Sequence, residues 1–217
     1  MSPHGFYSLA RVFDSMSNTD SNPYSAGDVG HFDRFARLYD FFSSPFDADI
    51  LAEGLAQADR PIERVVDVAG GTGRAVRAID ADERIVLDAS KKMLVQAHRR
   101  GLACVRGDAS RLPLDSESVD AIVISDALHH IGDAEDALAE VERVLNPGGV
   151  LVIREFNPAT IRGKLLVRGE HAIGMNSVFF TPEELTRMLA GAELVPHVRN
   201  RGFDYTVAGV KRTSGIT

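Results

Sequence analysis

Short apolar runs alternate with helical patterns over most of this chain, and this alternation constrains the fold more than any other feature. The first run, Arg64–Val68, is rich in β-branched residues. Further runs of this kind lie at 84–87, 102–106, 121–124, 150–153, 194–198 and 205–210. Apolar strands separated by helices form a mostly parallel sheet whose two faces are both covered. We therefore predict an α/β fold with a doubly wound sheet.

Helix signals lie between these runs. Helices are expected around 74–79, over 90–99 and over 133–145, and two more helical patterns occur between 31 and 57. The segment Asn146-Pro147-Gly148-Gly149 is typical of a helix end. At 181–184 another helix should begin, because Thr181 can cap it, Pro182 suits its first position and Glu184 completes a capping box.

A glycine-rich turn follows the first strand. Asp67 precedes the segment Ala69-Gly70-Gly71-Thr72-Gly73, in which glycines let the backbone approach a ligand closely. Asp88 ends the second strand, where a carboxylate can accept both hydroxyls of a ribose. The pattern favours a nucleotide-like ligand, although a tight turn without any ligand would also use these glycines.

Composition excludes several classes of protein. A net charge of −7 over 217 residues argues against a protein that grips phosphate backbones. Cys104 is the only cysteine, so an internal disulfide and a cysteine-rich metal site are excluded, and we expect no metal. The first thirty residues lack the apolar stretch of a signal peptide, and no segment is apolar enough to span a membrane. The expected location is the cytoplasm.

Taken in order, these motifs resemble those of the class I S-adenosylmethionine-dependent methyltransferases, from about residue 31 to 212. The matching features are Asp67 before the glycine loop, Asp88 after the second strand, Gly107-Asp108-Ala109 after the third and Leu145–Gly149 before the fifth. The resemblance implies a seven-stranded Rossmann-like sheet of order 3-2-1-4-5-7-6. It also implies S-adenosylmethionine as the cofactor and a small molecule as the methyl acceptor.

The resemblance also assigns roles to individual residues. The implied cofactor-binding residues are Tyr39, Asp67, Ala69, Gly71, Gly73, Asp88, Ala89, Met93, Asp108, Ala109 and Ser125. Among them, Asp67 would hold the methionine part, Asp88 the ribose and Asp108 the adenine edge. Met93 would pack on the adenine, and Ser125 would lie beside the sulfonium. Each acid could instead cap a loop or a helix, and Tyr39 could simply pack.

Three segments resemble the ubiquinone and menaquinone C-methyltransferases in particular. They are Ala69–Gly73, Phe32–Asp40 and Glu155-Phe156. Those enzymes carry an Arg-Asn pair after the fourth strand, whereas this chain has Asp126-Ala127-Leu128-His129-His130. Two acceptors therefore stay open: a polyprenyl hydroquinone methylated on carbon, or another small molecule methylated on oxygen or nitrogen.

Methylating a ring carbon or a weakly acidic oxygen requires a base that raises the electron density of the acceptor. His129 and His130 follow the fourth strand, at the edge of the sheet where ligands bind, and we favour His130 as the base. A histidine pair that makes only local hydrogen bonds is the alternative.

The resemblance also suggests how the chain is organised. We expect a loosely ordered leader over 1–30, helices over 31–60 that cover the cofactor, the cofactor-binding domain over 61–212 and, within it, an acceptor lid over 156–180. In the lid, Leu165-Leu166-Val167 is flanked by basic residues, which permits at most peripheral contact with a membrane.

Rival functions fit less well. A nicotinamide oxidoreductase normally has a third glycine three residues beyond Gly73, where this chain has Val76. A nucleic-acid methyltransferase is disfavoured by the acidic balance and by the lack of an Asn-Pro-Pro-Tyr-type segment after the fourth strand. A cofactor-binding module without catalysis is compatible with the same motifs.

Overall fold

The computed structural model describes Gly30 and residues 48–213. Residues 1–29 of the leader expected over 1–30, and residues 31–47 of the helices expected over 31–60, lie outside the described residues, as does Tyr39. None of the helices within 48–213 is long and apolar enough to cross a membrane.

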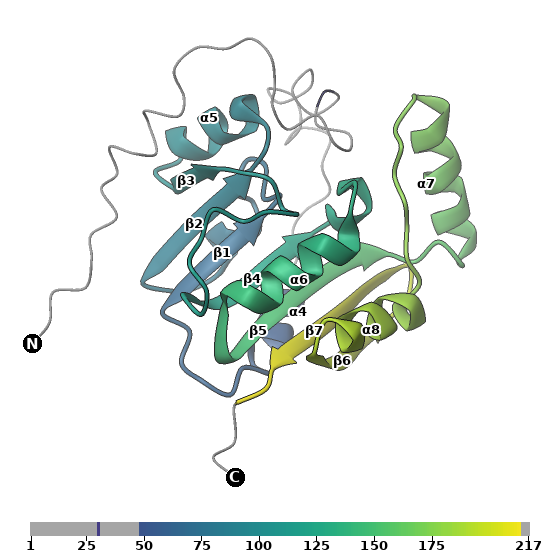
Figure 1. Ribbon diagram of the computed structural model, residues 1–217. Coiled ribbons are helices and arrows are strands. Elements are labelled where there is room, and N and C mark those ends of the chain that lie inside the picture. The colour runs from purple at the N-terminus through teal and green to yellow at the C-terminus, as the bar shows by residue number, and fades with distance from the viewer. Residues whose placement is uncertain (1–29, 31–47, 214–217) are drawn as a thin grey trace, which may run out of the picture.

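Seven strands form one sheet in the order β3-β2-β1-β4-β5-β7-β6, which confirms the predicted order (Figure 1). The strands are β1 (Arg64–Val68), β2 (Glu83–Asp88), β3 (Ala103–Arg106), β4 (Val119–Ser125), β5 (Leu145–Phe156), β6 (Leu194–Arg201) and β7 (Asp204–Lys211). The first five are parallel, while β7 runs antiparallel to both of its neighbours. All βα turns of the parallel strands therefore lie at one edge.

Helices cover both faces of the sheet, as predicted. They are α4 (Ala48–Leu55), α5 (Lys91–Arg99), α6 (Ala134–Val144), α7 (Ile161–Ala172) and α8 (Pro182–Gly191), with short 3-10 helices η1 (Val76–Ala78) and η2 (Leu128–His130). Leu138 of α6 and Leu185 of α8 belong to the core on one face, whereas Leu51 of α4 and Leu94 of α5 belong to the core on the other. Helix α7 stands away from the sheet (Figure 1), and Gly163 is its one buried residue.

The helix predicted around 74–79 is mostly absent, and this prediction was wrong. Turns over 71–75 lead into η1, which contains only Val76–Ala78. Positive φ angles at Gly71 and Gly73 keep the chain in turns at the start of this connection, and Ile79 is already extended, with φ −99° and ψ 133°. Only one 3-10 turn lies between them.

The capping signals were read correctly. Thr181 and Glu184 form the predicted capping box at the start of α8, with Pro182 in the first turn. Asp133 caps α6 by accepting the N–H of Asp136. The segment Asn146–Gly149 does end α6, but it also belongs to β5, which begins at Leu145 beside Val119.

A buried carboxylate ties together the starts of three strands. Asp120 is 5% exposed, and its Oδ2 accepts the N–H groups of Glu63 and Arg64 at 3.1 and 2.9 Å. Its Oδ1 accepts the side-chain amide of Asn146 at 2.9 Å and lies 2.8 Å from Nε of Arg60. This cluster lies at the edge of the sheet opposite to the βα turns.

We predict that Asp120→Ala lowers the free energy of unfolding by about 2–4 kcal/mol, because it leaves buried donors without an acceptor. Urea unfolding followed by circular dichroism would measure the loss. Asp115→Ala is the matched control, since that side chain is exposed in the preceding loop. A loss no larger than that of the control would contradict the role given to Asp120.

Candidate active site

A pocket opens at the carboxyl ends of β1, β2 and β4, beside the point where the strand order reverses between β1 and β4. It is lined by Asp67, Ala69–Thr72, Arg74, Ala75, Leu87–Ala89, Met93, Gly107–Ser110, Ser125–Ala127 and His130–Gly132. Ligands of open parallel sheets bind at such a reversal. Most of the residues predicted for the cofactor site lie together here, although Gly73 is not among the lining residues. Of the two predicted catalytic residues, His130 lines the pocket and His129 does not.

The glycine loop is held in a conformation that few other residues could adopt. Ala69 and Gly71 have positive φ angles of 53° and 55°. A Cβ atom on Gly70 would lie 2.4 Å from Cγ of Asp67, so the backbone passes directly over this carboxyl group. At Gly73, with φ 77°, a Cβ atom would lie 2.2 Å from Leu102. Gly73 thus serves close packing against the core behind the loop.

Asp67 is buried beneath the loop, 1% exposed. Its Oδ2 accepts the N–H of Val76 at 3.3 Å, while its Oδ1 has no hydrogen-bond partner among the described residues. Burial raises the pKa of Asp67 to about 7, the Val76 N–H opposes the shift and nearby Asp88 adds to it. A buried oxygen without a partner is costly. The site therefore suits a ligand that brings a cationic donor.

Asp88 anchors the loop from the end of β2. Its Oδ2 accepts the N–H of Gly71 at 2.8 Å, and its Oδ1 accepts the N–H of Ser90 at 2.7 Å. Ser90 in turn caps α5 by accepting the N–H of Met93. Each carboxylate oxygen can accept a second hydrogen bond, so the structural role leaves room for ribose hydroxyls.

Two other predicted residues line the pocket beside the ends of β2 and β3. Met93 is 2% exposed and lines the wall. A Cβ atom added to Gly71 would lie 3.9 Å from the Met93 sulfur. Asp108 accepts the N–H of Ser110 at 2.9 Å from the next wall. Ala89 and Ala109 line the pocket beside them.

The two histidines of η2 have different environments. His130 lines the pocket with Ser125, whereas His129 is 2% exposed and lies behind the wall. Nδ1 of His129 is 2.6 Å from Oε2 of Glu155, which is itself 2% exposed. Although burial opposes a charged ring, Glu155 raises the pKa of His129. In the same way burial opposes the charge on Glu155, but His129 lowers the pKa of that carboxyl group.

Asp126 is a pocket residue that the sequence reasoning did not select. It directly follows β4, has a positive φ of 53° and forms an ion pair with Arg154 of β5. Burial raises the pKa of Asp126 to about 6, while Arg154 opposes the shift. Nη2 of Arg154 also lies 3.2 Å from Asp204. An acid placed just after a buried strand, at the ligand edge of the sheet, was the signal that could have identified it.

Aromatic side chains gather beside the histidines. Phe179 stacks on His129 with ring centroids 4.2 Å apart, and Phe156 meets the same ring edge-on at 6.3 Å. Phe156 also packs against Phe203 at 5.3 Å. These aromatic side chains are not among the residues that line the pocket, so they pack behind the wall that contains His130.

Residues 66–153 match the family model described as a methyltransferase domain. A demethylmenaquinone methyltransferase of Beutenbergia cavernae is 38% identical over 152 residues, which are 64% of this chain and 60% of that protein. A ubiquinone/menaquinone biosynthesis C-methyltransferase of Cereibacter sphaeroides is 33% identical over 150 residues, 59% of this chain and 58% of that protein. The chain thus matches about three fifths of the length of these relatives.

A solved structure extends the likeness to the whole sheet. The S-adenosylmethionine-dependent methyltransferase of Thermotoga maritima, described as a possible histamine N-methyltransferase, superposes with a TM-score of 0.70 at 23% identity. The superposition covers 85% of this chain and all of that one, which shows a common fold. The strand order, the glycine loop and these matches make the chain similar to the class I S-adenosylmethionine-dependent methyltransferases, and in particular to the quinone methyltransferases.

Proposed function

We propose that this protein transfers a methyl group from S-adenosylmethionine to a small-molecule acceptor, and that the acceptor is a polyprenyl hydroquinone. The observation that carries the first part is the pocket beside β1, which collects Asp67, Asp88 and Asp108 around the glycine loop. The unpartnered Oδ1 of Asp67 fits the ammonium group of the cofactor's methionine part.

The remaining cofactor contacts follow from the same geometry. When bound, S-adenosylmethionine supplies an electrophilic methyl group on its sulfonium. Asp88 would accept the ribose hydroxyls, Met93 would pack on the adenine, and Asp108 with the Ala109 N–H would hold the adenine edge. Ser125 would lie at the sulfonium end. The protein's main contribution would be to orient the acceptor and exclude water, which can lower a barrier by several kcal/mol.

On the acceptor side, we assign His130 as the base. It lines the pocket three residues beyond Ala127, and Asp126 is a second acid-base group in the same wall. Segment 156–180, which contains α7, is proposed as the acceptor lid. Ile161, Leu165 and Ile173 are 81%, 67% and 64% exposed there, which suits a lipophilic acceptor.

The hydroquinone assignment draws on the names of the relatives and on the aromatic rings of Phe156 and Phe179, which pack on His129 behind the pocket wall. The second candidate, another small molecule methylated on oxygen or nitrogen, is favoured by a different observation. After the fourth strand, where the quinone enzymes carry Arg-Asn, residues 126–130 contain a histidine pair. One of these histidines, His129, lies 2.6 Å from a carboxylate oxygen of Glu155.

We expect S-adenosylhomocysteine to bind with micromolar affinity and NAD not to bind, because Asp67, Asp88, Asp108 and the glycine loop follow the pattern of S-adenosylmethionine sites. Titration calorimetry with both ligands measures this directly. Incubation with S-adenosylmethionine and demethylated quinols, followed by mass spectrometry, then tests methyl transfer. Binding of NAD without any S-adenosylhomocysteine signal would refute the proposed cofactor.

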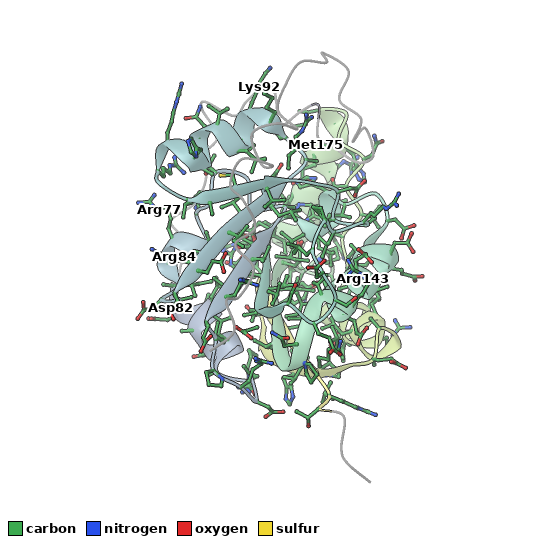
Figure 2. All side chains as sticks on the ribbon, turned by 60° about the vertical axis from the view of Figure 1, so that its left-hand side comes forward. Arg77, Asp82, Arg84, Lys92, Arg143 and Met175 are labelled. Atoms are coloured by element: carbon green, nitrogen blue, oxygen red, sulfur yellow. The ribbon has the colours of Figure 1, made fainter. Side chains whose placement is uncertain are left out.

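Asp88→Ala should weaken binding of S-adenosylhomocysteine by about 2–3 kcal/mol, since it removes charge-assisted hydrogen bonds to the ribose. Part of the loss will come from the Gly71 N–H, which Asp88 also holds. Asp82→Ala is the matched control, because Asp82 precedes the same strand and points away from the body of the protein (Figure 2). Equal affinities of the two variants would rule out the ribose assignment.

Affinity for S-adenosylhomocysteine should depend on pH through Asp67. The pKa of its carboxyl group is about 7, so lowering the pH from 8 to 6 protonates it and removes the negative charge that the ligand's ammonium requires. We expect affinity to fall by about tenfold over this range. Asp67→Asn should be weak and nearly independent of pH. Asp126→Asn is the control, because it removes the other acid of raised pKa in the pocket. If Asp126→Asn abolishes the dependence, the assignment to Asp67 is wrong.

Deletion of the gene in its host should cause demethylated quinone to accumulate, and His130→Ala should lose turnover while still binding S-adenosylhomocysteine. Lipid extracts analysed by mass spectrometry check the first outcome, and calorimetry with a turnover assay checks the second. Unchanged quinone composition in the deletion strain would leave the second candidate function.

A further inference from the structure

Three metal-ligating side chains converge behind the acceptor side of the pocket. His129 and His130 come from η2, and Glu170 comes from α7, forty residues further along the chain. One donor atom from each lies within 4.8 Å of the other two, and Nε2 of His129 is 3.9 Å from Oε1 of Glu170. We call these three residues the His-His-Glu cluster. The sequence analysis did not predict it, because its members are far apart in sequence.

The buried histidine of this cluster is oriented as metal ligands are. Oε2 of Glu155 lies within hydrogen-bond distance of Nδ1 of His129, at 2.6 Å. Oε1 of Glu155 accepts the backbone N–H of His129 at 3.3 Å. Phe179 stacks on the ring, with its plane 15° from that of the imidazole. These contacts direct Nε2 toward Glu170. A carboxylate bound to the far nitrogen is the usual partner of a metal-ligating histidine.

The third ligand is also held in place. Oε2 of Glu170 accepts the hydroxyl of Ser177, which is 4% exposed, so Oε1 is the oxygen that faces His129. The N–H of Val178 donates to the carbonyl of His129 at 2.8 Å, which joins the segment after α7 to η2. The cluster therefore rests on hydrogen bonds from both of its elements.

Two imidazoles and one carboxylate suit zinc and neighbouring first-row metals. Ligand bonds of about 2.0–2.1 Å place the donor atoms of a tetrahedral zinc ion roughly 3.4 Å apart. The observed distances are 3.9 Å between Nε2 of His129 and Oε1 of Glu170 and at most 4.8 Å for the other two pairs, so the side chains would have to move closer together. Glu170, which is 16% exposed, has room for such a movement. Three protein ligands leave the fourth position open, as in catalytic zinc sites.

We propose that the His-His-Glu cluster binds one divalent transition-metal ion, with zinc as the best match, and that Glu155 positions His129 for this purpose. Because His130 also lines the cofactor pocket, the ion would lie in the pocket wall. There its open position could take a hydroxyl of the acceptor and lower the pKa of that hydroxyl, with the proton passing to water. His130 would then act as a ligand, and the ion would take the place of the base assigned to His130 above. This role, unlike the binding itself, rests on the proposed function.

Metal binding can be tested without any cofactor or acceptor. Protein freed of histidine tags and stripped with a chelator is titrated with Co²⁺, whose visible spectrum reports its ligands, and with Zn²⁺ in competition with a chromophoric chelator. We expect one ion per chain. His130→Gln and Glu170→Gln should each lower the metal affinity at least about tenfold. Loss of a residue that only supports a metal ligand typically costs about that much, and loss of a ligand itself should cost more.

His171→Gln is the matched control, because His171 neighbours Glu170 on α7 but lies outside the cluster. Its Nε2 contacts the carbonyl of Ser177, so the variant also perturbs the local hydrogen bonds. It should keep full metal affinity. Circular dichroism would establish that all variants fold, and the two ligand variants alter residues that are not fully buried.

Failure of this proposal can be told apart from failure of the proposed function. S-adenosylhomocysteine should bind the metal-free protein, because none of its expected contacts involves the His-His-Glu cluster except the pocket wall at His130. Absence of metal binding below millimolar concentrations, or equal affinity in His130→Gln, Glu170→Gln and wild type, would overturn the metal site. Loss of S-adenosylhomocysteine binding in the wild type would instead overturn the methyltransferase function.

Discussion

The parallel pairing of β1 with both β2 and β4 is the constraint on which the rest of the structure depends. Parallel strands send all of their carboxyl ends to one edge, and the order reverses between β1 and β4. The glycine loop, Asp88 and the residues after β4 therefore meet although they are separated in sequence. Burial of β1 on both faces gives this meeting point a rigid base, since Val65, Val66 and Val68 are all inaccessible to solvent.

Buried acids serve opposite purposes at the two ends of this sheet. At the amino end, Asp120 accepts backbone and side-chain hydrogen bonds that join β1, β4 and β5. At the carboxyl end, Asp67 has an oxygen without a partner among the described residues, and its pKa is raised to about 7. The first arrangement stabilises the fold. The second lowers the stability of the fold, because a buried oxygen has no donor, but a ligand can supply that donor. Such a loss of stability is common in functional sites.

The pocket wall that contains His130 is built from segments that only the folding of the chain brings together. Arg154 of β5 pairs with Asp126 after β4, and Glu155 pairs with His129 of η2. The N–H of Asn157 donates to the carbonyl of Phe203, and that of Val178 donates to His129. The segment that carries α7 is thus attached near the site at both of its ends. A movement of this segment would therefore also displace the pocket wall that contains His130.

The sequence by itself indicated the alternating strands and helices, because apolar runs and capping residues act within a few residues of each other. The strand order and the residues expected around the cofactor followed from the resemblance of the ordered motifs to a known family, and the structure confirms the order. Asp67, Asp88 and Asp108 lie at or near the ends of β1, β2 and β3. The misjudged helix around 74–79 shows where local pattern fails, since that connection contains only the 3-10 turn Val76–Ala78.

Only the tertiary structure showed that His129 and His130, which are adjacent in sequence, have different surroundings. Burial against Glu155 and Phe179 removed His129 from the pocket wall and left His130 in it. Packing between elements also places the backbone of Gly73 against Leu102, and it brings Glu170 of α7 close to the two histidines. These outcomes depend on contacts between elements distant in the chain, and no periodicity or motif within one element encodes them.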